Sequence, residues 1–116
     1  MFLDDTLMVA DALAYNGTPK VIDLRKAGIG PGEKVRMVII GSSDLAGATG
    51  YTVTDGTTNA AATAHASHTC TLAGKAIEFV LNQDVSQYVK VALSGSPSAG
   101  SWTCGVIGVG NAQTNV

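Results

Sequence analysis

The chain has 116 residues, of which only 14% are charged, and its formal net charge is -2. Soluble domains carry about 25% charged residues, and one domain commonly spans about 100 to 200 residues, so we expect a single domain of low charge. The seven basic residues are scattered along the sequence. Because nucleic acids are bound by concentrated basic patches, this composition disfavours a nucleic-acid partner.

The N-terminal stretch MFLDDTLM places two carboxylates where a secretory signal would carry positive charge. No apolar run approaches the roughly 18 residues of a membrane span. We therefore expect an intracellular product with no membrane partner. In a reducing cytoplasm, Cys70 and Cys104 are expected to remain free and to act as small apolar side chains.

Residues 1–19 mix apolar residues with aspartates and show neither helical nor strand periodicity clearly. Asn16-Gly17-Thr18-Pro19 stops any helix, so we predict an extended N-terminal arm with at most one helical turn. The apolar residues of such an arm must lie against this domain's sheet or against a neighbouring subunit.

Short strands are predicted at 20–24, 33–41, 51–54, 68–72 and 76–81. The strand at 33–41 is the clearest, with Val35, Met37 and Ile39 pointing one way. Val38 and Ile40 make its other face apolar as well. This pattern indicates that the strand is covered on both sides at this end, by a subunit or by a loop.

The connecting segments have the composition of turns and loops. Residues 25–32 carry three glycines and a proline, 42–50 read as a loop, and Asp55-Gly56 is a strong turn dipeptide. Residues 57–67 are small and polar, which fits either a weak edge strand or a mobile surface loop. The polar tail 110–116 is expected to fray.

The C-terminal stretch 88–109 has two alternating segments separated by a Gly/Ser/Pro cluster. This pattern predicts a hairpin in which Leu93 pairs with Trp102. Six apolar side chains would then share one face and need cover from the rest of the chain. They are Val89, Val91, Leu93, Trp102, Cys104 and Val106.

About seven or eight short antiparallel strands with Gly-rich turns predict an all-β fold, a jelly-roll-like β-sandwich. We assign residues 1–19 to the arm, 20–109 to the sandwich and 110–116 to the tail. An immunoglobulin-like sandwich is the alternative, and a barrel comes third.

His65, His68 and Cys70 are the one cluster of metal-ligand residue types. On a regular strand His65 and His68 point to opposite faces, and a structural zinc site needs four ligands, so we expect no metal. The segment 28–34 lacks the spacing of phosphate-binding loops and is expected to be a turn. The aspartates are dispersed, which predicts no acid and base pair. We therefore expect no enzyme and no cofactor.

With this architecture, the chain resembles the small jelly-roll capsid cement (decoration) proteins of tailed bacteriophages, particularly short-tailed phages. The likeness rests on Leu3-Asp4, Ala10-Asp11-Ala12, Val21-Ile22-Asp23-Leu24, the glycine-rich 28–33 segment and Tyr88-Val-Lys-Val-Ala-Leu93 with Ala99-Gly100. Residues 57–71 match no pattern of that family.

The resemblance implies a structural virion protein that binds the outside of an assembled capsid and bridges major capsid protein subunits. It further implies a homo-oligomer, a dimer or alternatively a trimer, made in the host bacterial cytoplasm and ending on the capsid exterior. We expect capsid or subunit contacts from the arm and from the 25–31 loop. The contact residues are Phe2, Leu3, Leu7, Met8, Val9, Leu13, Arg25, Lys26, Ile29 and Pro31.

Two other functions compete with this one. Jelly rolls also bind carbohydrate, and Tyr15, Tyr51 and Tyr88 are candidates for exposed aromatic side chains of such a virion-surface module. The third hypothesis is a small enzyme or metal protein built on His65, His68 and Cys70.

Overall fold

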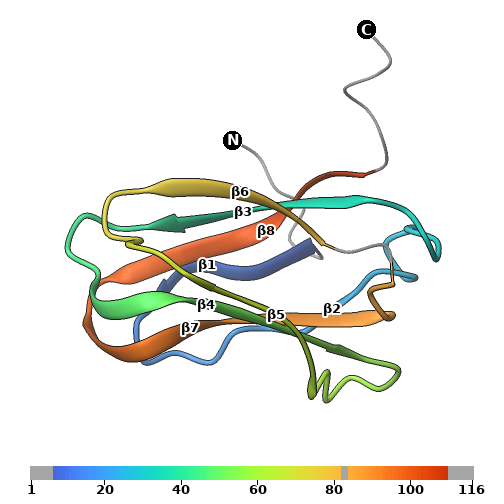
Figure 1. The fold of residues 1–116 in the computed structure, drawn as a ribbon, viewed down its shortest axis with the longest axis horizontal. Helices are drawn as coiled ribbons and strands as arrows, with labels where there is room; N and C mark the ends of the chain where they lie inside the picture. Colours follow the sequence, from blue (N-terminus) through green and yellow to red (C-terminus); the bar gives the residue numbers. More distant parts are fainter. Residues whose placement is uncertain (1–6, 82–83, 110–116) are drawn as a thin grey trace, which may run out of the picture.

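The computed structural model describes residues 7–81 and 84–109, which form two facing antiparallel sheets of four strands (Figure 1). Sheet A has the order β1-β8-β3-β6 and sheet B the order β2-β7-β4-β5. The all-β sandwich predicted from the sequence is confirmed. The strands are β1 (Met8–Ala14), β2 (Ile22–Asp23), β3 (Val35–Gly41), β4 (Ala46–Gly56), β5 (Thr63–Thr69), β6 (Ala76–Leu81), β7 (Tyr88–Ala99) and β8 (Ser101–Val109).

The strands pair in nested fashion. β1 pairs with β8, β2 with β7, β3 with β6 and β4 with β5, all antiparallel. The pairings of β3 with β8 and of β4 with β7 join these four pairs into the two sheets. Nested antiparallel pairs wrapped into two facing sheets make a jelly roll. The immunoglobulin-like alternative places the first two strands side by side, whereas here β1 and β2 lie in different sheets.

The predicted hairpin at 88–109 is wrong in its pairing. β7 belongs to sheet B and β8 to sheet A, and the chain changes sheet at Gly100. Two strands that face each other across a core bury the same alternate side chains as two neighbours in one sheet, so alternation cannot distinguish the two arrangements. The expected inward face is correct: five of its six side chains are buried, and Leu93 packs partly buried against the core.

The core lies between the two sheets and contains side chains from all four strands of sheet A. Val35, Met37 and Ile39 have no exposed surface, as their spacing predicts. Val38 is only 3% exposed although it is on the opposite face of β3. It shares a row of sheet A with Gly105 and Met8. Because glycine has no side chain, the two apolar side chains share the outer face across it.

The N-terminal segment is part of the sandwich from Met8 onward. β1 is the edge strand of sheet A, with two register shifts along its pairing to β8, and Val9 and Ala10 enter the core. The described apolar residues of the arm, Leu7, Val9, Ala10 and Leu13, therefore lie in or against this domain's own core. The predicted arm residues 1–6 and the tail 110–116 lie outside the described residues.

β4 and β5 are longer than the sequence indicates. Residues 46–50, expected as loop, begin β4, and the strand continues through the expected turn at Asp55-Gly56. Residues 63–69 form β5, so the edge-strand alternative for 57–67 holds for its second half. Low β-propensity at Gly50 is overridden by its pairing with Ser94 of β7, since tertiary pairing decides strand formation in such segments.

Candidate functional site

The loop 24–34 lies at one end of the sandwich, and the start of β1 is directed toward that end. Val35, the first residue after the loop, pairs with Val109 at the end of β8, whereas Met8 pairs with Gly105 at the centre of β8. We call this end the contact end; Figure 1 shows its loop on the right. Of the two segments predicted to make capsid or subunit contacts, the loop thus lies at this end, and β1 begins at the middle of sheet A and runs away from it.

The loop 24–34 is anchored to the sandwich. The Leu24 N–H donates to the Gln87 carbonyl, and the Ile29 N–H donates to the Leu24 carbonyl, both at 2.8 to 2.9 Å. The Ile29 side chain is 4% exposed and packs in the core. The Arg25 guanidinium donates to the Ile29 carbonyl at 2.8 Å. These contacts hold the loop in one shape, so its outer residues are presented on a fixed backbone.

Asp23 organises the beginning of this loop. Its Oδ1 accepts the backbone N–H groups of Arg25 and Lys26 and the side-chain amide of Gln87, at 3.0 to 3.2 Å. The hydrogen bond from Gln87, with smaller contributions from the two N–H groups and the Lys26 charge, lowers the pKa of Asp23. The carboxylate form is therefore the one that orders the loop.

The predicted contact residues differ in accessibility. Val9 and Ile29 are buried in the core, and Met8 is 9% exposed, so these three support the fold of their own chain. Leu7 and Leu13 are partly buried against the core. Lys26 and Pro31 are exposed and Arg25 is half-buried. Phe2 and Leu3 lie outside the described residues. Among the predicted contact residues that the structure describes, the accessible ones therefore lie in the loop and along the edge of β1.

A hollow of about 150 Å³ lies along the edge strand β1. The Lys20 N–H donates to the Val9 carbonyl at 2.7 Å, which ties residues 18–20 to the beginning of this edge. The hollow gives the edge of β1 a concave, mainly apolar margin. Its lining comprises Met8, Val9, Ala10, Asp11, Leu13, Thr18 and Lys20.

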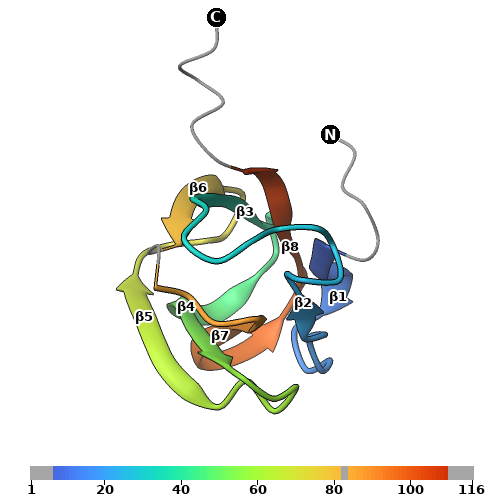
Figure 2. The same ribbon diagram turned by 90° about the vertical axis from the view of Figure 1, so that its right-hand side faces the viewer.

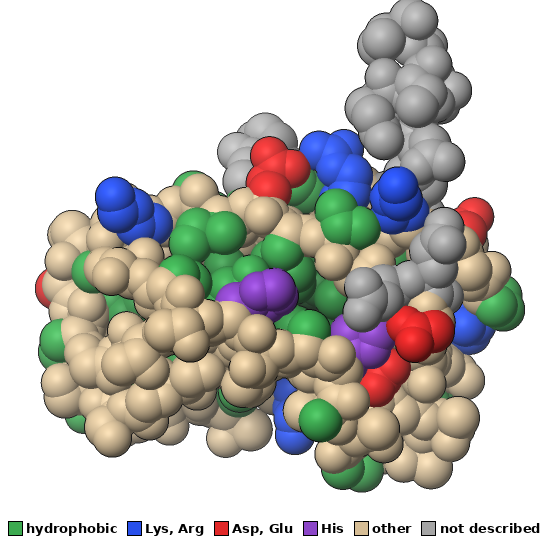
Figure 3. All heavy atoms as spheres, viewed as in Figure 1, with side chains coloured by type: hydrophobic (Ala, Val, Ile, Leu, Met, Phe, Trp, Pro, Cys, Tyr) green, Lys and Arg blue, Asp and Glu red, His purple; other side chains and the backbone are tan. Residues whose placement is uncertain are grey.

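A second site lies on the other side of the sandwich, where the edge strands β5 and β6 face each other (Figure 2). Figure 3 shows apolar side chains gathered in a hollow between these strands, with the two histidines beside them. The pocket has a volume of about 140 Å³. Its lining comprises Val53, His65, Ala66, His68, Phe79, Val80 and Leu81.

The prediction that His65 and His68 point to opposite faces is wrong, since both line this pocket. Val53 pairs with Ala66, but the next residue of β4, Thr54, pairs with Ala64. His65 is therefore the extra residue of a β-bulge, and a bulge changes the face to which a side chain points.

The Asp55 carboxylate lies next to the imidazole ring of His65. The Asp55 Oδ2 lies 3.4 Å from His65 Nδ1, and both side chains are 7% exposed. The same oxygen accepts the Ser86 N–H at 2.8 Å. Asp55 was expected at a turn, bonded to nearby backbone; instead it is buried in β4 and is bonded to a residue 31 positions away. Sequence reasoning missed this pair because its two members become neighbours only through the β4–β5 pairing.

The three tyrosines of the carbohydrate hypothesis differ in their exposure. Tyr51, a candidate for an exposed tyrosine, is 2% exposed, with its ring centroid 5.1 Å from His68 and 4.8 Å from Phe79. Burial raises the pKa of its hydroxyl. Tyr15 is 37% exposed at the turn after β1, and Tyr88 is half-buried. The expectation of an exposed Tyr51 is wrong, which removes one of the three tyrosines of the carbohydrate hypothesis.

Both cysteines are free, Cys104 buried and Cys70 half-buried. Burial raises the pKa of the Cys104 thiol to about 12.

Within residues 7–81 and 84–109, no three His, Cys, Asp or Glu side chains are grouped so that they could hold a metal ion. The same residues include no helix with the length and apolarity of a membrane span.

Comparison of the chain with protein-family models, with curated proteins and with solved structures finds no match.

Proposed function

We propose that this protein is a structural virion protein that binds the outer surface of a tailed-phage capsid and bridges major capsid protein subunits. The proposal starts from the sequence resemblance to capsid cement proteins. The observation that best supports it is the arrangement of the two expected contact segments: the loop 24–34 lies at one end of the jelly roll, and the start of β1 is directed toward that end.

The anchored loop suits this role. Lys26 and Pro31 are exposed on a backbone fixed by the Asp23 hydrogen bonds and by the buried Ile29 side chain. A loop that is already ordered loses little conformational entropy when it docks, so more of its contact energy appears as affinity. Lys26 offers the positive charge of this surface to a carboxylate of the capsid.

Bridging requires more than one contact per assembly. We propose that the protein is a homo-oligomer, a dimer or alternatively a trimer. Its copies bind neighbouring capsid subunits. Once one copy is bound, the second binds at a high effective concentration, so moderate interfaces suffice. Sedimentation velocity of the purified protein measures the oligomer directly.

Binding is tested by sedimenting the protein with expanded capsids of the phage that encodes it. Lys26→Glu reverses a charge at the contact end, and Lys75→Glu makes the same change on an exposed lysine at the other end, beside Gly41. We expect Lys26→Glu to weaken capsid binding at least tenfold and Lys75→Glu to leave it unchanged. Equal effects of the two reversals, with both variants folded, contradict the assignment of the contact end.

Deletion of residues 2–6 tests the other segment. A deletion through residue 12 would remove most of β1 and so damage sheet A, whereas residues 2–6 precede the strand. We expect the short deletion to reduce oligomerisation or capsid binding while the far-ultraviolet circular dichroism spectrum stays the same. Unchanged oligomerisation and unchanged binding contradict a contact role for Phe2 and Leu3.

A further inference from the structure

We propose that the pocket between β5 and β6 is a binding site for a small hydroxylated molecule, with an apolar body about the size of a benzene ring and with His65 as its polar anchor. The pocket lies between the edge strands opposite β1 and β2. The proposal does not depend on capsid binding, because the pocket can bind its ligand whether or not the contact end has a partner.

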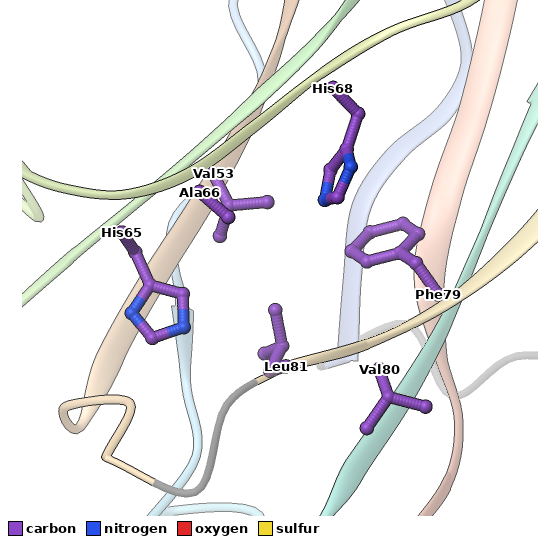
Figure 4. Close-up of a pocket in the computed structure, with 7 residues that line it drawn as sticks. All are labelled: Val53, His65, Ala66, His68, Phe79, Val80 and Leu81. Atoms are coloured by element: carbon purple, nitrogen blue, oxygen red, sulfur yellow. The ribbon is translucent and has the colours of Figure 1, made fainter.

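The anchor is a buried imidazole with one nitrogen held and the other open to the pocket. Nδ1 faces the Asp55 carboxylate at 3.4 Å, which favours a proton on Nδ1. Asp55 is itself fixed by the Ser86 N–H. His65 Nε2 is buried and has no hydrogen-bond partner among the described residues. Figure 4 shows this nitrogen on the side of the ring that faces Leu81 and the middle of the pocket.

A buried nitrogen without a partner destabilises the protein, so a ligand that completes its hydrogen bonding gains affinity from the site. The neutral ring offers a lone pair at Nε2, and the protonated ring offers an N–H there. A hydroxyl both donates and accepts, so it satisfies Nε2 in either state. A carboxylate would satisfy only the protonated ring, and an ammonium group only the neutral one.

The rest of the pocket is suited to an apolar body. Val53, Ala66, Phe79 and Leu81 point into it from both sheets, whereas Val80 points away from the centre (Figure 4). The His68 ring lies beside Phe79 at the end of the pocket away from His65 and packs against Tyr51 (Figure 4). The volume of about 140 Å³ is close to that of a protein cavity of about 150 Å³ that binds benzene. A charged ligand would lose its hydration against such walls without compensation.

Phenol is the minimal probe for this chemistry, and benzene is its match without the hydroxyl. Titrations followed by two-dimensional NMR should show saturable binding of phenol, with the largest shifts at Val53, His65, Ala66, Phe79 and Leu81. We expect phenol to bind about tenfold more tightly than benzene. His65→Phe should remove this preference while leaving benzene binding within about threefold. Equal binding of the two probes to the wild type, no binding, or shifts centred elsewhere would overturn the proposal.

A second pair of variants keeps the test valid if His65→Phe does not fold. Ala66→Met places a longer side chain in the pocket without replacing Asp55 or His65, and Ser67→Met makes a comparable change on the neighbouring exposed residue. Ala66→Met should weaken phenol binding at least tenfold, and Ser67→Met should not change it. The same affinity in both variants contradicts this location of the site.

Discussion

Ala99 and Ser101 are separated by a single residue, yet they belong to different sheets. Ala99 pairs with Ala46 in sheet B, and Ser101 pairs with Ala14 in sheet A. Gly100 makes this change of sheet with a φ of 93°, and a Cβ at this position would lie 2.4 Å from the Leu45 Cα. The crossing of the chain from sheet B to sheet A therefore depends on a glycine at position 100.

Replacement of Gly100 by alanine should be strongly destabilising. It combines an unfavourable positive φ with a clash against backbone that cannot move freely. Gly28→Ala is the matched control, since its φ is 85° but no heavy atom lies within 4 Å of the added Cβ. In urea unfolding we expect Gly28→Ala to cost about 1 to 2 kcal/mol and Gly100→Ala distinctly more. Equal losses would show that no clash accompanies the strain.

Truncation of Trp102 should show how much the inward face of β8 contributes. The side chain is 3% exposed and belongs to the core cluster. Trp102→Ala should lower the free energy of unfolding by about 3 to 5 kcal/mol, through lost burial and the cavity left behind. Val80→Ala, at a residue 53% exposed, should cost less than about 0.5 kcal/mol. A loss below about 1 kcal/mol at Trp102 contradicts its place in the core.

Cys104 should make the protein sensitive to alkaline pH. Burial raises its pKa to about 12 in the folded chain, whereas a thiol in an unfolded chain ionises near pH 8.5. The stabilising contribution is complete below about pH 8.5 and is lost as the pH rises toward the folded-state pKa, by roughly 2 kcal/mol at pH 10. Urea unfolding at pH 7.5 and pH 10 should show this extra loss in the wild type but not in Cys104→Ala. Identical pH dependence in the two proteins argues against a buried thiol.

The carboxyl group of Asp23 should titrate at a lower pH in the wild type than in Gln87→Ala. The Gln87 amide donates to Asp23 Oδ1 at 3.0 Å and is the largest cause of the lowered pKa. A lowered folded-state pKa gives stability that is present at neutral pH and is lost as the pH falls below about 4. Carbon-detected NMR of the carboxyl groups measures the shift, with the other aspartates as internal references. No change at Asp23 would contradict the role of Gln87 and would leave the two backbone N–H groups and the Lys26 charge as the causes of the lowered pKa.

The strands that could be predicted from the sequence are those whose alternation is strong. Val35, Met37 and Ile39 on β3, and Ile77 and Phe79 on β6, show the period of two that a buried face imposes. Their partners could not be predicted, because the same inward faces fit a hairpin and a sheet crossing. The difference between β7 as a hairpin arm and β7 as a strand of sheet B lies in pairings with residues about 40 positions away.

The two candidate sites differ in how much of their structure could be predicted from the sequence. The glycine-rich 25–32 segment was expected to be a loop from its composition, and Asp23 lies where an aspartate commonly caps a turn. By contrast, Asp55 resembles a turn residue because glycine follows it, and the bulge at His65 results from the register of β5 on β4. No local pattern in residues 57–67 indicates that register.

The most direct test of the proposed function is the temperature at which capsids release their DNA. Heads lacking the protein are heated with a DNA-binding dye, alone and after saturation with the wild type or with Lys26→Glu. If the protein bridges capsid subunits as proposed, the wild type raises the release temperature, and Lys26→Glu raises it less at the same concentration. A release temperature that stays the same when the wild type is present in excess contradicts the proposal that this protein stabilises the capsid.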